Sequence, residues 1–352
     1  MIAVKAAQFH EYGGPEVLQL VDLPEPRSVP GEALVRVQRC GVNPIDRSSM
    51  SGRFGEQLKL PHTPGSEIVG TVVELGSDTT GPDEGTTVAV AMRLLCGRCR
   101  FCLAGDETSC LRQLPKTPPL QIVGVATDGG YAEFVNAPAQ NLVPVPSGLD
   151  IDQATAAVVC GATAHHLLNR ARVQAGERVL VVGASGGVGI FAMQLAVNRG
   201  AEVFAVTSGK RKHKGLQELN AQHLVERDGG TYSERVRDLT AGEGVDVVID
   251  PLGSATFEES LACLGRKGRY VTCGVLTGGD VGFDLAPLYL NEQEIIGSTT
   301  ASRSDLLAVL NQLAQGTLYC PIHASYPLEG AADALTTLDD PDRFGKVLLE
   351  VD

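Results

Sequence analysis

The stretch at residues 178–208, RVLVVGASGGVGIFAMQLAVNRGAEVFAVTS, decides the fold. It opens with the apolar run VLVV at 179–182, which has the length and β-branched content of a buried strand. A glycine-rich turn at 183–189 leads into a segment with helical spacing that ends at Gly200, a residue typical of helix C-termini. A second apolar strand follows at 203–206. Strand, glycine-rich turn, helix and strand within about thirty residues predict a dinucleotide-binding unit.

The turn GASGGVG offers two features that a pyrophosphate needs. Its glycines let the backbone approach the phosphates, and the following helix presents free N–H groups and the positive end of its dipole. The turn departs from the G-x-G-x-x-G pattern at the first position, which is Ala184. A tight strand–helix turn without a ligand is the alternative. We expect contacts to the cofactor from Ser185, Gly186, Gly187 and Val188.

The length and charge of the chain limit its class. A length of 352 residues predicts about two domains. The net charge of −13 disfavours a broad surface for nucleic acid or anionic membranes, because phosphate binding needs a positive field. The chain has no apolar run long enough for a membrane helix and no signal-peptide core, so we expect a cytoplasmic protein. Nine cysteines, an odd number, argue against a disulfide framework in that compartment.

Two patterns of secondary structure divide the chain. Residues 1–155 have short strand patterns separated by Gly, Pro and Asp turns. A helix is expected at 152–172, and residues 178–275 then alternate strand and helix, which predicts a parallel sheet with helices on both faces. The other elements expected are strands at 33–37, 68–75, 87–92, 122–125, 131–135 and 295–297, a helix at 304–315 and a final strand at 344–351.

Four cysteines have the spacing of a metal centre, C-x2-C-x2-C-x7-C, formed by Cys96, Cys99, Cys102 and Cys110. Four thiolates at this spacing suit tetrahedral zinc, and a full set of protein ligands leaves no position for a substrate, which makes the metal structural. Disulfides at this spacing would be strained, and they would be reduced in the cytosol. An iron–sulfur or other redox role and an empty site are the alternatives.

The β-rich first half, the four-cysteine lobe and the Gly-Gly-Val-Gly turn together resemble the medium-chain dehydrogenase/reductase superfamily over essentially the whole chain. The resemblance implies an α/β fold with a GroES-like catalytic domain at residues 1–155 and 298–352, which includes the zinc lobe at 93–112. It also implies a central Rossmann NADP-binding domain, a doubly wound parallel sheet, at residues 156–297. A small-molecule substrate and a homodimer or tetramer, joined near residues 274–297, are implied as well.

The zinc alcohol dehydrogenases of this superfamily also carry a catalytic zinc. Their Cys and His ligands correspond to Asn43, in GVNPID at 41–46, and to Ser66, in GSE at 65–67. Their third ligand corresponds to Val159, with a cysteine one residue out of register. The resemblance therefore implies that a catalytic zinc is lacking. The alternative is a displaced site formed by Cys40, His62 and Cys160.

The GVNP stretch at 41–44 and the ASGGVG turn at 184–189 resemble the quinone oxidoreductase and enoyl or alkenal reductase branch. The four-cysteine lobe departs from most quinone reductases. The enoyl-thioester reductases of this branch have a proton-donating Tyr shortly after the N-P-x-D motif. This chain has Phe54 there, which counts against an enoyl-CoA substrate.

The end of the second strand of the dinucleotide unit argues for NADPH. A NAD site usually has an Asp or Glu there to bind the ribose hydroxyls. This chain has TSG at 207–209 and then the basic run KRKHK at 210–214. In a chain of net charge −13 that cluster fits a 2′-phosphate, with Ser208, Lys210 and Arg211 as the expected ligands. A solvated basic start of a helix is the alternative.

Other contacts are carried over position by position from the resemblance. Arg227 corresponds to an adenine-side contact, Asn43 and Thr163 to contacts on the nicotinamide side, and Gly274 and Val275 to residues that border the nicotinamide. Asn43 is the side chain expected nearest to the reacting centre, and thus the candidate catalytic residue.

Two further sets of polar residues are expected to be structural. Asp46 and Glu67 match superfamily positions, and without a metal they are expected to orient neighbouring groups. His165 and His166 fall within a helix, as core or capping histidines.

An alcohol or aldehyde reaction normally calls for a Lewis acid at the oxygen, whereas quinones and activated C=C bonds spread the charge by conjugation. We therefore expect an NADPH-dependent oxidoreductase that positions a quinone or an α,β-unsaturated carbonyl compound for hydride transfer. The alternatives are a zinc-dependent alcohol dehydrogenase with displaced ligands and a non-catalytic NADPH-binding protein of the same fold.

Overall fold

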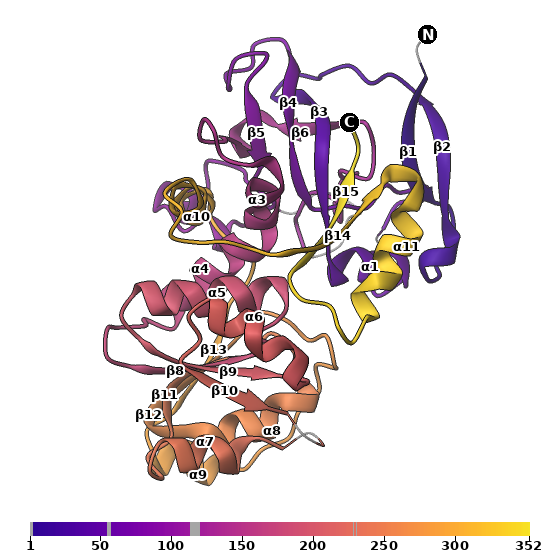
Figure 1. The fold of residues 1–352 in the computed structure, drawn as a ribbon. Helices are drawn as coiled ribbons and strands as arrows, with labels where there is room; N and C mark the ends of the chain where they lie inside the picture. Colours follow the sequence, from indigo (N-terminus) through magenta and orange to yellow (C-terminus); the bar gives the residue numbers. More distant parts are fainter. Residues whose placement is uncertain (1–2, 55–57, 113–119, 228, 230) are drawn as a thin grey trace.

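The computed structural model describes residues 3–54, 58–112, 120–227, 229 and 231–352. They form two lobes, each built on its own large β-sheet (Figure 1). Within this part of the chain, no helix is long and apolar enough to cross a membrane.

One lobe contains a six-stranded sheet in the order β10-β9-β8-β11-β12-β13, and all of its pairings are parallel. Numbered along the chain from β8, this order is 3-2-1-4-5-6, that of the doubly wound dinucleotide fold. The predicted alternation of strand and helix is therefore confirmed. The strands are β8 (Arg178–Val182), β9 (Glu202–Thr207), β10 (His223–Glu226), β11 (Val245–Ile249), β12 (Leu264–Thr272) and β13 (Glu294–Gly297).

Alternation along the strands places helices on both faces of this sheet. In β8, Val179 and Val181 belong to the core formed with α4 and α5, whereas Leu180 and Val182 belong to the core formed with α7 and α8. Figure 1 shows the two groups of helices above and below the sheet. The helices of this lobe are α4 (Ala162–Arg170), α5 (Gly187–Asn198), α6 (His213–Glu218), α7 (Ser233–Leu239), α8 (Ser254–Cys263) and α9 (Leu285–Leu290).

The other lobe contains a seven-stranded sheet in the order β14-β15-β3-β4-β5-β7, with β6 also paired to β3. The C-terminal strand β15 pairs antiparallel with β3, and Val347 lies opposite Val42, so residues from both ends of the chain meet in one sheet. A separate hairpin, β1–β2, packs beside it (Figure 1). The strands are β1 (Ala3–Phe9), β2 (Leu18–Pro24), β3 (Glu32–Val42), β4 (Glu67–Leu75), β5 (Thr87–Val90), β6 (Phe134–Pro138), β7 (Leu142–Pro144), β14 (Ile322–Pro327) and β15 (Lys346–Glu350).

Three predicted elements differ in the structure. The strand expected at 131–135 begins later, as β6 at Phe134–Pro138. The helix expected at 152–172 is divided into α3 (Ile151–Ala156), a π-helical segment at Ala157–Gly161, and α4. The strand expected at 122–125 is a tight turn with isolated bridges at Ile122 and Val123, because the N–H groups of residues 125 and 126 turn back to the Ile122 carbonyl. The remaining helices are α1 (Pro44–Met50), α2 (Arg100–Leu103), α10 (Arg303–Ala314) and α11 (Ala331–Thr336).

Candidate functional site

A cavity of about 590 Å³ lies where the two lobes meet. The dinucleotide lobe contributes the turn after β8 and the ends of β9 and β12. The other lobe contributes the end of β3, the start of β15 and the residue before β4. Predicted site residues that line this cavity are Asn43, Thr163, Ser185, Gly186, Gly187, Val188, Ser208, Arg227, Gly274 and Val275.

The glycine-rich turn is fixed by two close approaches. A Cβ on Gly189 would lie 2.3 Å from the Gly183 carbonyl oxygen, so a side chain would push the start of α5 away from β8. A Cβ on Gly187 would lie 2.6 Å from Cys160 Sγ and 2.8 Å from Lys346 Cδ, side chains that come from two other elements. The turn therefore allows the N-terminus of the twelve-residue α5 to face the cavity, with its unpaired N–H groups available to an anion.

The basic residues after β9 divide into two groups. Lys210 lies 3.7 Å from Glu226, and Arg211 donates to Asp342 at 2.7 Å; both are exposed and line an adjoining pocket but not the main cavity. Lys212 instead lines both hollows, as does Arg227. Lys212 follows Lys210 and Arg211 directly in the sequence, and it was not among the predicted phosphate ligands.

Arg343, on the loop before β15, adds a cation to this end of the cavity from the other lobe. Burial lowers the pKa of Lys212, and the charge of Arg343 lowers it further, so the two cations face a common space. Arg343 donates to the carbonyls of Leu338 and Gly345, and no carboxylate of a described residue pairs with it. Asp340 lines the same end and offsets part of the charge of Lys212 and Arg343, and the excess of cations over carboxylates there suits an anionic ligand.

The floor of the cavity contains a buried ion pair that was not predicted from the sequence. Lys346, 3% exposed, donates from Nζ to Glu67 Oε2 at 2.5 Å, to Asn43 Oδ1 at 2.8 Å and to the Val42 carbonyl at 3.0 Å. Burial opposes its charge, but the neighbouring Cys160 and Glu67 side chains raise the pKa of Lys346 above its usual range. Its three protons are therefore all used within the protein.

Glu67 holds this floor together. Its Oε1 accepts hydrogen bonds from the backbone N–H groups of Val159 and Cys160 at 2.9 and 3.1 Å, within the π-helical segment. Its Oε2 accepts from Asn43 Nδ2 at 2.9 Å as well as from Lys346. Glu67 therefore orients neighbouring groups as expected, but its charged partner is a lysine, and its contacts accompany the interruption of the predicted helix.

Asp46 lies beside the same floor. Its Oδ2 accepts from the Asn43 N–H at 2.8 Å and from the Tyr131 hydroxyl at 3.2 Å. Complete burial raises the pKa of Asp46 to about 7. The residue fixes the start of α1, and thereby the backbone of Asn43, as expected of an orienting group.

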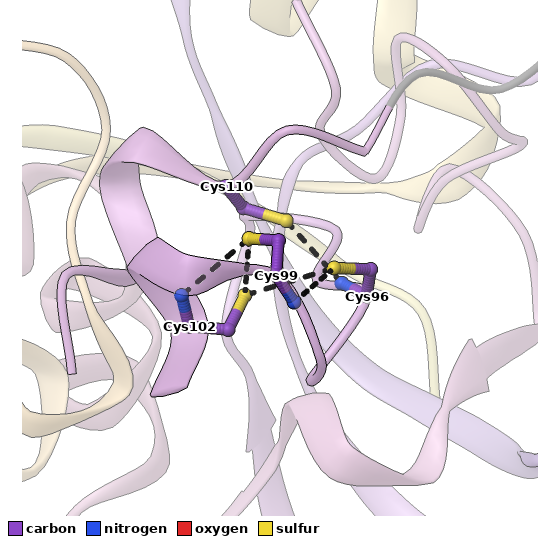
Figure 2. A group of neighbouring side chains, drawn as sticks. All are labelled: Cys96, Cys99, Cys102 and Cys110. Atoms are coloured by element: carbon purple, nitrogen blue, oxygen red, sulfur yellow. Dashed lines mark hydrogen bonds between the residues drawn. The ribbon is translucent and has the colours of Figure 1, made fainter. Parts of the chain in front are cut away.

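The four cysteines meet as the spacing predicted. The sulfur atoms of Cys96, Cys99, Cys102 and Cys110 all lie within 4.8 Å of one another (Figure 2). Backbone N–H groups point at these sulfurs, and hydrogen bonds from residues 102 and 111 lower the pKa of Cys99 to about 6. Four thiolates in one cluster fit a structural zinc ion, which the lobe would hold with all four ligands from the protein.

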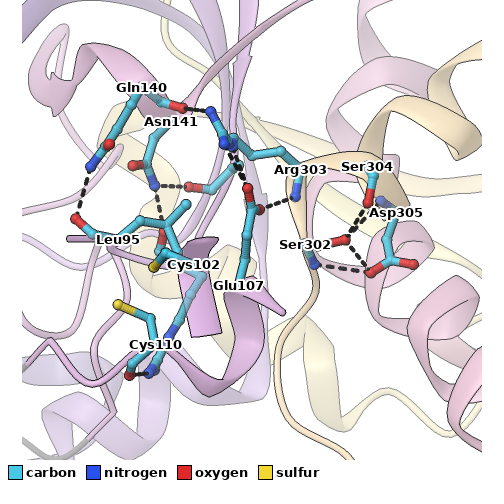
Figure 3. A network of polar contacts seen from close by, with 12 residues as sticks. Leu95, Cys102, Glu107, Cys110, Gln140, Asn141, Ser302, Arg303, Ser304 and Asp305 are labelled. Atoms are coloured by element: carbon cyan, nitrogen blue, oxygen red, sulfur yellow. Dashed lines mark hydrogen bonds and ion pairs between the residues drawn. The ribbon is translucent and has the colours of Figure 1, made fainter. Parts of the chain in front are cut away.

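The cysteine lobe is joined to the helix that packs on the dinucleotide lobe (Figure 3). Arg303, at the start of α10, donates from Nε and from its backbone N–H to Glu107, each at 2.8 Å. Two residues on, Asp305 accepts hydrogen bonds from His165 and His166 of α4 at 2.7 and 3.1 Å. The two histidines therefore connect helices, in agreement with the structural role expected of them.

The displaced metal site considered above does not assemble. Among residues 3–54, 58–112, 120–227, 229 and 231–352, the cysteine lobe is the one cluster of three or more His, Cys, Asp or Glu side chains close enough to share an ion. Cys160 Sγ donates to Asn43 Oδ1 at 3.5 Å, and His62 Nε2 bonds to the Gly124 carbonyl at 3.0 Å. Cys40 is buried and contacts the Gly41 carbonyl.

Known proteins resemble both lobes. Residues 29–147 match the alcohol dehydrogenase GroES-like domain family, and residues 187–315 match the zinc-binding dehydrogenase family. The acryloyl-coenzyme A reductase of Metallosphaera sedula is 31% identical over 93% of this chain and 95% of its own. The quinone oxidoreductase of Rattus norvegicus is 30% identical over 98% of this chain and 97% of its own.

The cobalt- and zinc-bound thermostable alcohol dehydrogenase of Pyrobaculum aerophilum shares 37% identity with a TM-score of 0.89, over 99% of this chain and 100% of its own. The similarity to all three enzymes spans nearly the full chain and both sheets. The chain therefore belongs to the medium-chain dehydrogenase/reductase superfamily of oxidoreductases.

Proposed function

We propose that the protein is an NADPH-dependent reductase that acts on a quinone or an α,β-unsaturated carbonyl compound without a catalytic zinc. The composition of the cavity floor carries this proposal. It presents the Asn43 amide, the Ser66 hydroxyl and the Cys160 thiol, and the fixed Lys346 ammonium, 2.8 Å from Asn43 Oδ1, opposes a divalent cation there. Conjugated acceptors spread the developing charge and do not require a Lewis acid.

The relatives are compatible with this class of acceptor. Two of them are named quinone oxidoreductase and acryloyl-coenzyme A reductase, whereas the Pyrobaculum enzyme is named an alcohol dehydrogenase. We propose that residues 1–155 and 298–352 supply the acceptor site and a structural zinc in the cysteine lobe, and that residues 156–297 supply the NADPH site.

NADPH, when bound, supplies the hydride. The residues of the chain would bind and orient the two reactants. The N–H groups at the start of α5 would hold the pyrophosphate, and Thr163, Gly274 and Val275 would border the nicotinamide. Asn43 is proposed as a positioning residue near the reacting centre, since its amide is bonded to Glu67 and Lys346. Apolar side chains that line the cavity would exclude water from the acceptor, among them Ile45, Phe54, Met92 and Leu120.

We expect Lys212→Ala and Arg227→Ala each to raise the KM for NADPH by about 10-fold or more and to leave the KM for NADH nearly unchanged. Each removes a cation that lines the phosphate end of the cavity, and a charge-assisted hydrogen bond contributes about 1.5–3 kcal/mol. Steady-state kinetics with the two cofactors measures the difference.

Lys210→Ala is the matched control, because Lys210 lies near Glu226 and outside the main cavity. A large effect from Lys210→Ala with none from Lys212→Ala would move the phosphate site to the outer pocket. A wild-type preference for NADH would contradict the proposed cofactor.

The proposed reaction is tested by following NADPH and NADH oxidation with quinones, alkenals, enones, enoyl thioesters and simple aldehydes, with zinc content measured on the same sample. We expect turnover of quinones or enones at about one zinc ion per chain, from the four-cysteine site. Aldehyde reduction by protein with two zinc ions per chain would support the alcohol dehydrogenase alternative. Cofactor binding without turnover of any acceptor would support the non-catalytic one.

We further propose a homodimer joined at the β13 edge of the six-stranded sheet. Apolar side chains are exposed beside this edge strand, including Tyr289 at 69% and Leu290 at 62%. A strand with one open edge next to an exposed apolar patch is typical of a surface that another chain covers. The tetramer remains the alternative assembly.

The double variant Tyr289→Glu/Leu290→Glu is expected to convert the dimer to a monomer, because it places two charges in the contact. Light scattering coupled to size-exclusion chromatography gives the mass. Leu20→Glu, on an exposed position of β2, is the control and should leave the mass unchanged. A monomeric wild type would contradict the proposal.

A further inference from the structure

Two residues that line the cavity, Thr300 and Ser66, have a buried hydroxyl without a partner among the described residues, and Ser66 lies on the floor. The residue is 1% exposed and lines the cavity, and no described residue forms a hydrogen bond with its Oγ. A buried polar atom without a partner costs about 1–3 kcal/mol, and such atoms in native structures call for an explanation. A bound ligand that supplies the missing partner is one.

The neighbouring polar groups have no hydrogen-bonding capacity left for a ligand. Asn43 Oδ1 accepts from Lys346 and Cys160, and its Nδ2 donates to Glu67 and to the Gly41 carbonyl. The three protons of the Lys346 ammonium are all donated to acceptors of the protein, and the Cys160 thiol donates to Asn43. Ser66 is thus left to donate to a molecule in the cavity.

The position of Ser66 is fixed by the backbone on either side of it. Glu67 follows it at the start of β4 and is locked by four hydrogen bonds. The preceding Gly65 accepts from the Gly130 N–H at 2.9 Å. The backbone on both sides therefore holds the Ser66 side chain at the cavity floor, and donors held in place are what stabilise a developing charge.

We propose that Ser66 donates a hydrogen bond to the carbonyl oxygen of the acceptor, an inference that rests on the proposed reductase function. A hydroxyl offers one proton, and the oxygen of a quinone or an enone accepts one. Reduction adds a hydride, supplied by NADPH, and a proton, supplied by water, across the conjugated system, and the oxygen carries negative charge in between. The hydrogen bond to Ser66 then strengthens, so Ser66 lowers the barrier and also orients the acceptor.

The experiment compares Ser66→Ala with wild type on 2-cyclohexenone as the acceptor. We expect kcat/KM to fall by about 10- to 100-fold. Loss of one donor to a developing oxyanion costs about 100- to 1,000-fold, so this effect lies at or below the lower limit of that range. Difference infrared spectroscopy of carbonyl-¹³C cyclohexenone, bound in the presence of NADP⁺, gives a readout independent of turnover. The C=O stretch should lie at lower frequency in wild type than in Ser66→Ala.

Ser28→Ala is the matched control, because Ser28 Oγ is also buried without a partner among the described residues but does not line the cavity. It should change neither kcat/KM nor the stretch. Thermal unfolding of both variants checks that they fold. An unchanged C=O stretch and unchanged kcat/KM in Ser66→Ala would overturn the role of Ser66, while an active wild type would leave the reductase function intact. A wild type that reduces no conjugated acceptor would instead overturn the function itself. Weaker NADPH binding with an unchanged stretch would assign Ser66 to the cofactor and overturn the inference.

Discussion

Lys346→Met lowers the free energy of unfolding by about 3–5 kcal/mol, the expected cost of leaving one charge of a buried pair without its partner. In this variant the Glu67 carboxylate, fully buried, keeps its backbone donors but loses the ammonium 2.5 Å away. Asn43 Oδ1 and the Val42 carbonyl lose a donor at the same time. Chemical denaturation followed by circular dichroism measures the loss.

The double variant Lys346→Met/Glu67→Gln separates charge from packing. It removes both charges and leaves an oxygen acceptor for the Val159 and Cys160 N–H groups, so it should recover a large part of the lost stability. Lys5→Met is the matched control, since Lys5 and Glu329 form a pair at 2.8 Å that is about half exposed. It should change the free energy of unfolding little, because solvent screens this exposed pair. An equally small effect of Lys346→Met would show that the floor does not depend on the pair.

Cys102→Ser should have a second large effect, on the binding of zinc. One of four thiolates is lost, and we expect the affinity for zinc to fall by more than about 100-fold, beyond the 10- to 100-fold associated with partners outside the ligand shell. Zinc measured by plasma mass spectrometry after dialysis should drop from about one ion per chain to near zero. Without the ion the four cysteines are no longer joined, and the lobe is then held mainly by contacts such as that between Glu107 and Arg303 of α10. Protease cleavage within the lobe should therefore also increase.

Ser109→Ala is the control within the same lobe. Ser109 is exposed and adjacent to Cys110, and its replacement should leave the zinc content unchanged. Full zinc content in Cys102→Ser would place the metal elsewhere in the chain. Equal protease resistance of the metal-free and metal-bound forms would show that the ion does not order the lobe.

The fold was largely predictable because its patterns are local. The turn at 183–189 and the apolar runs on either side of it specify β8 and β9, the alternation that follows specifies the order of strands and helices up to β13, and the spacing of four cysteines within fifteen residues specifies their cluster. The π-helical segment at Ala157–Gly161 was not predictable, since it accompanies contacts with Glu67, more than ninety residues earlier in the chain.

The site was predicted only where local sequence patterns specify it. Residues in or beside sequence motifs, such as Ser185, Thr163 and Gly274, do line the cavity. Lys346 was missed because its function depends on the pairing of β15 with β3, which brings it next to Asn43 from three hundred residues away. One sequence signal was present: a lysine at the head of the apolar run VLLEV, inside a predicted strand, is a charge that the fold has to pair.

The pair formed by Arg211 and Asp342 lies at the pocket that adjoins the cavity, and it differs in exposure from the ion pair on the cavity floor. It joins the two lobes through side chains that are 82% and 52% exposed, so dissolved ions screen it, whereas the buried pair of Lys346 and Glu67 is shielded from them. Raising the ionic strength therefore weakens this exposed contact between the lobes and leaves the buried pair, whose two residues both belong to the lobe of the seven-stranded sheet, unchanged. The rate at which a dinucleotide enters and leaves, more than the stability of the fold, is the property of this protein that salt should control.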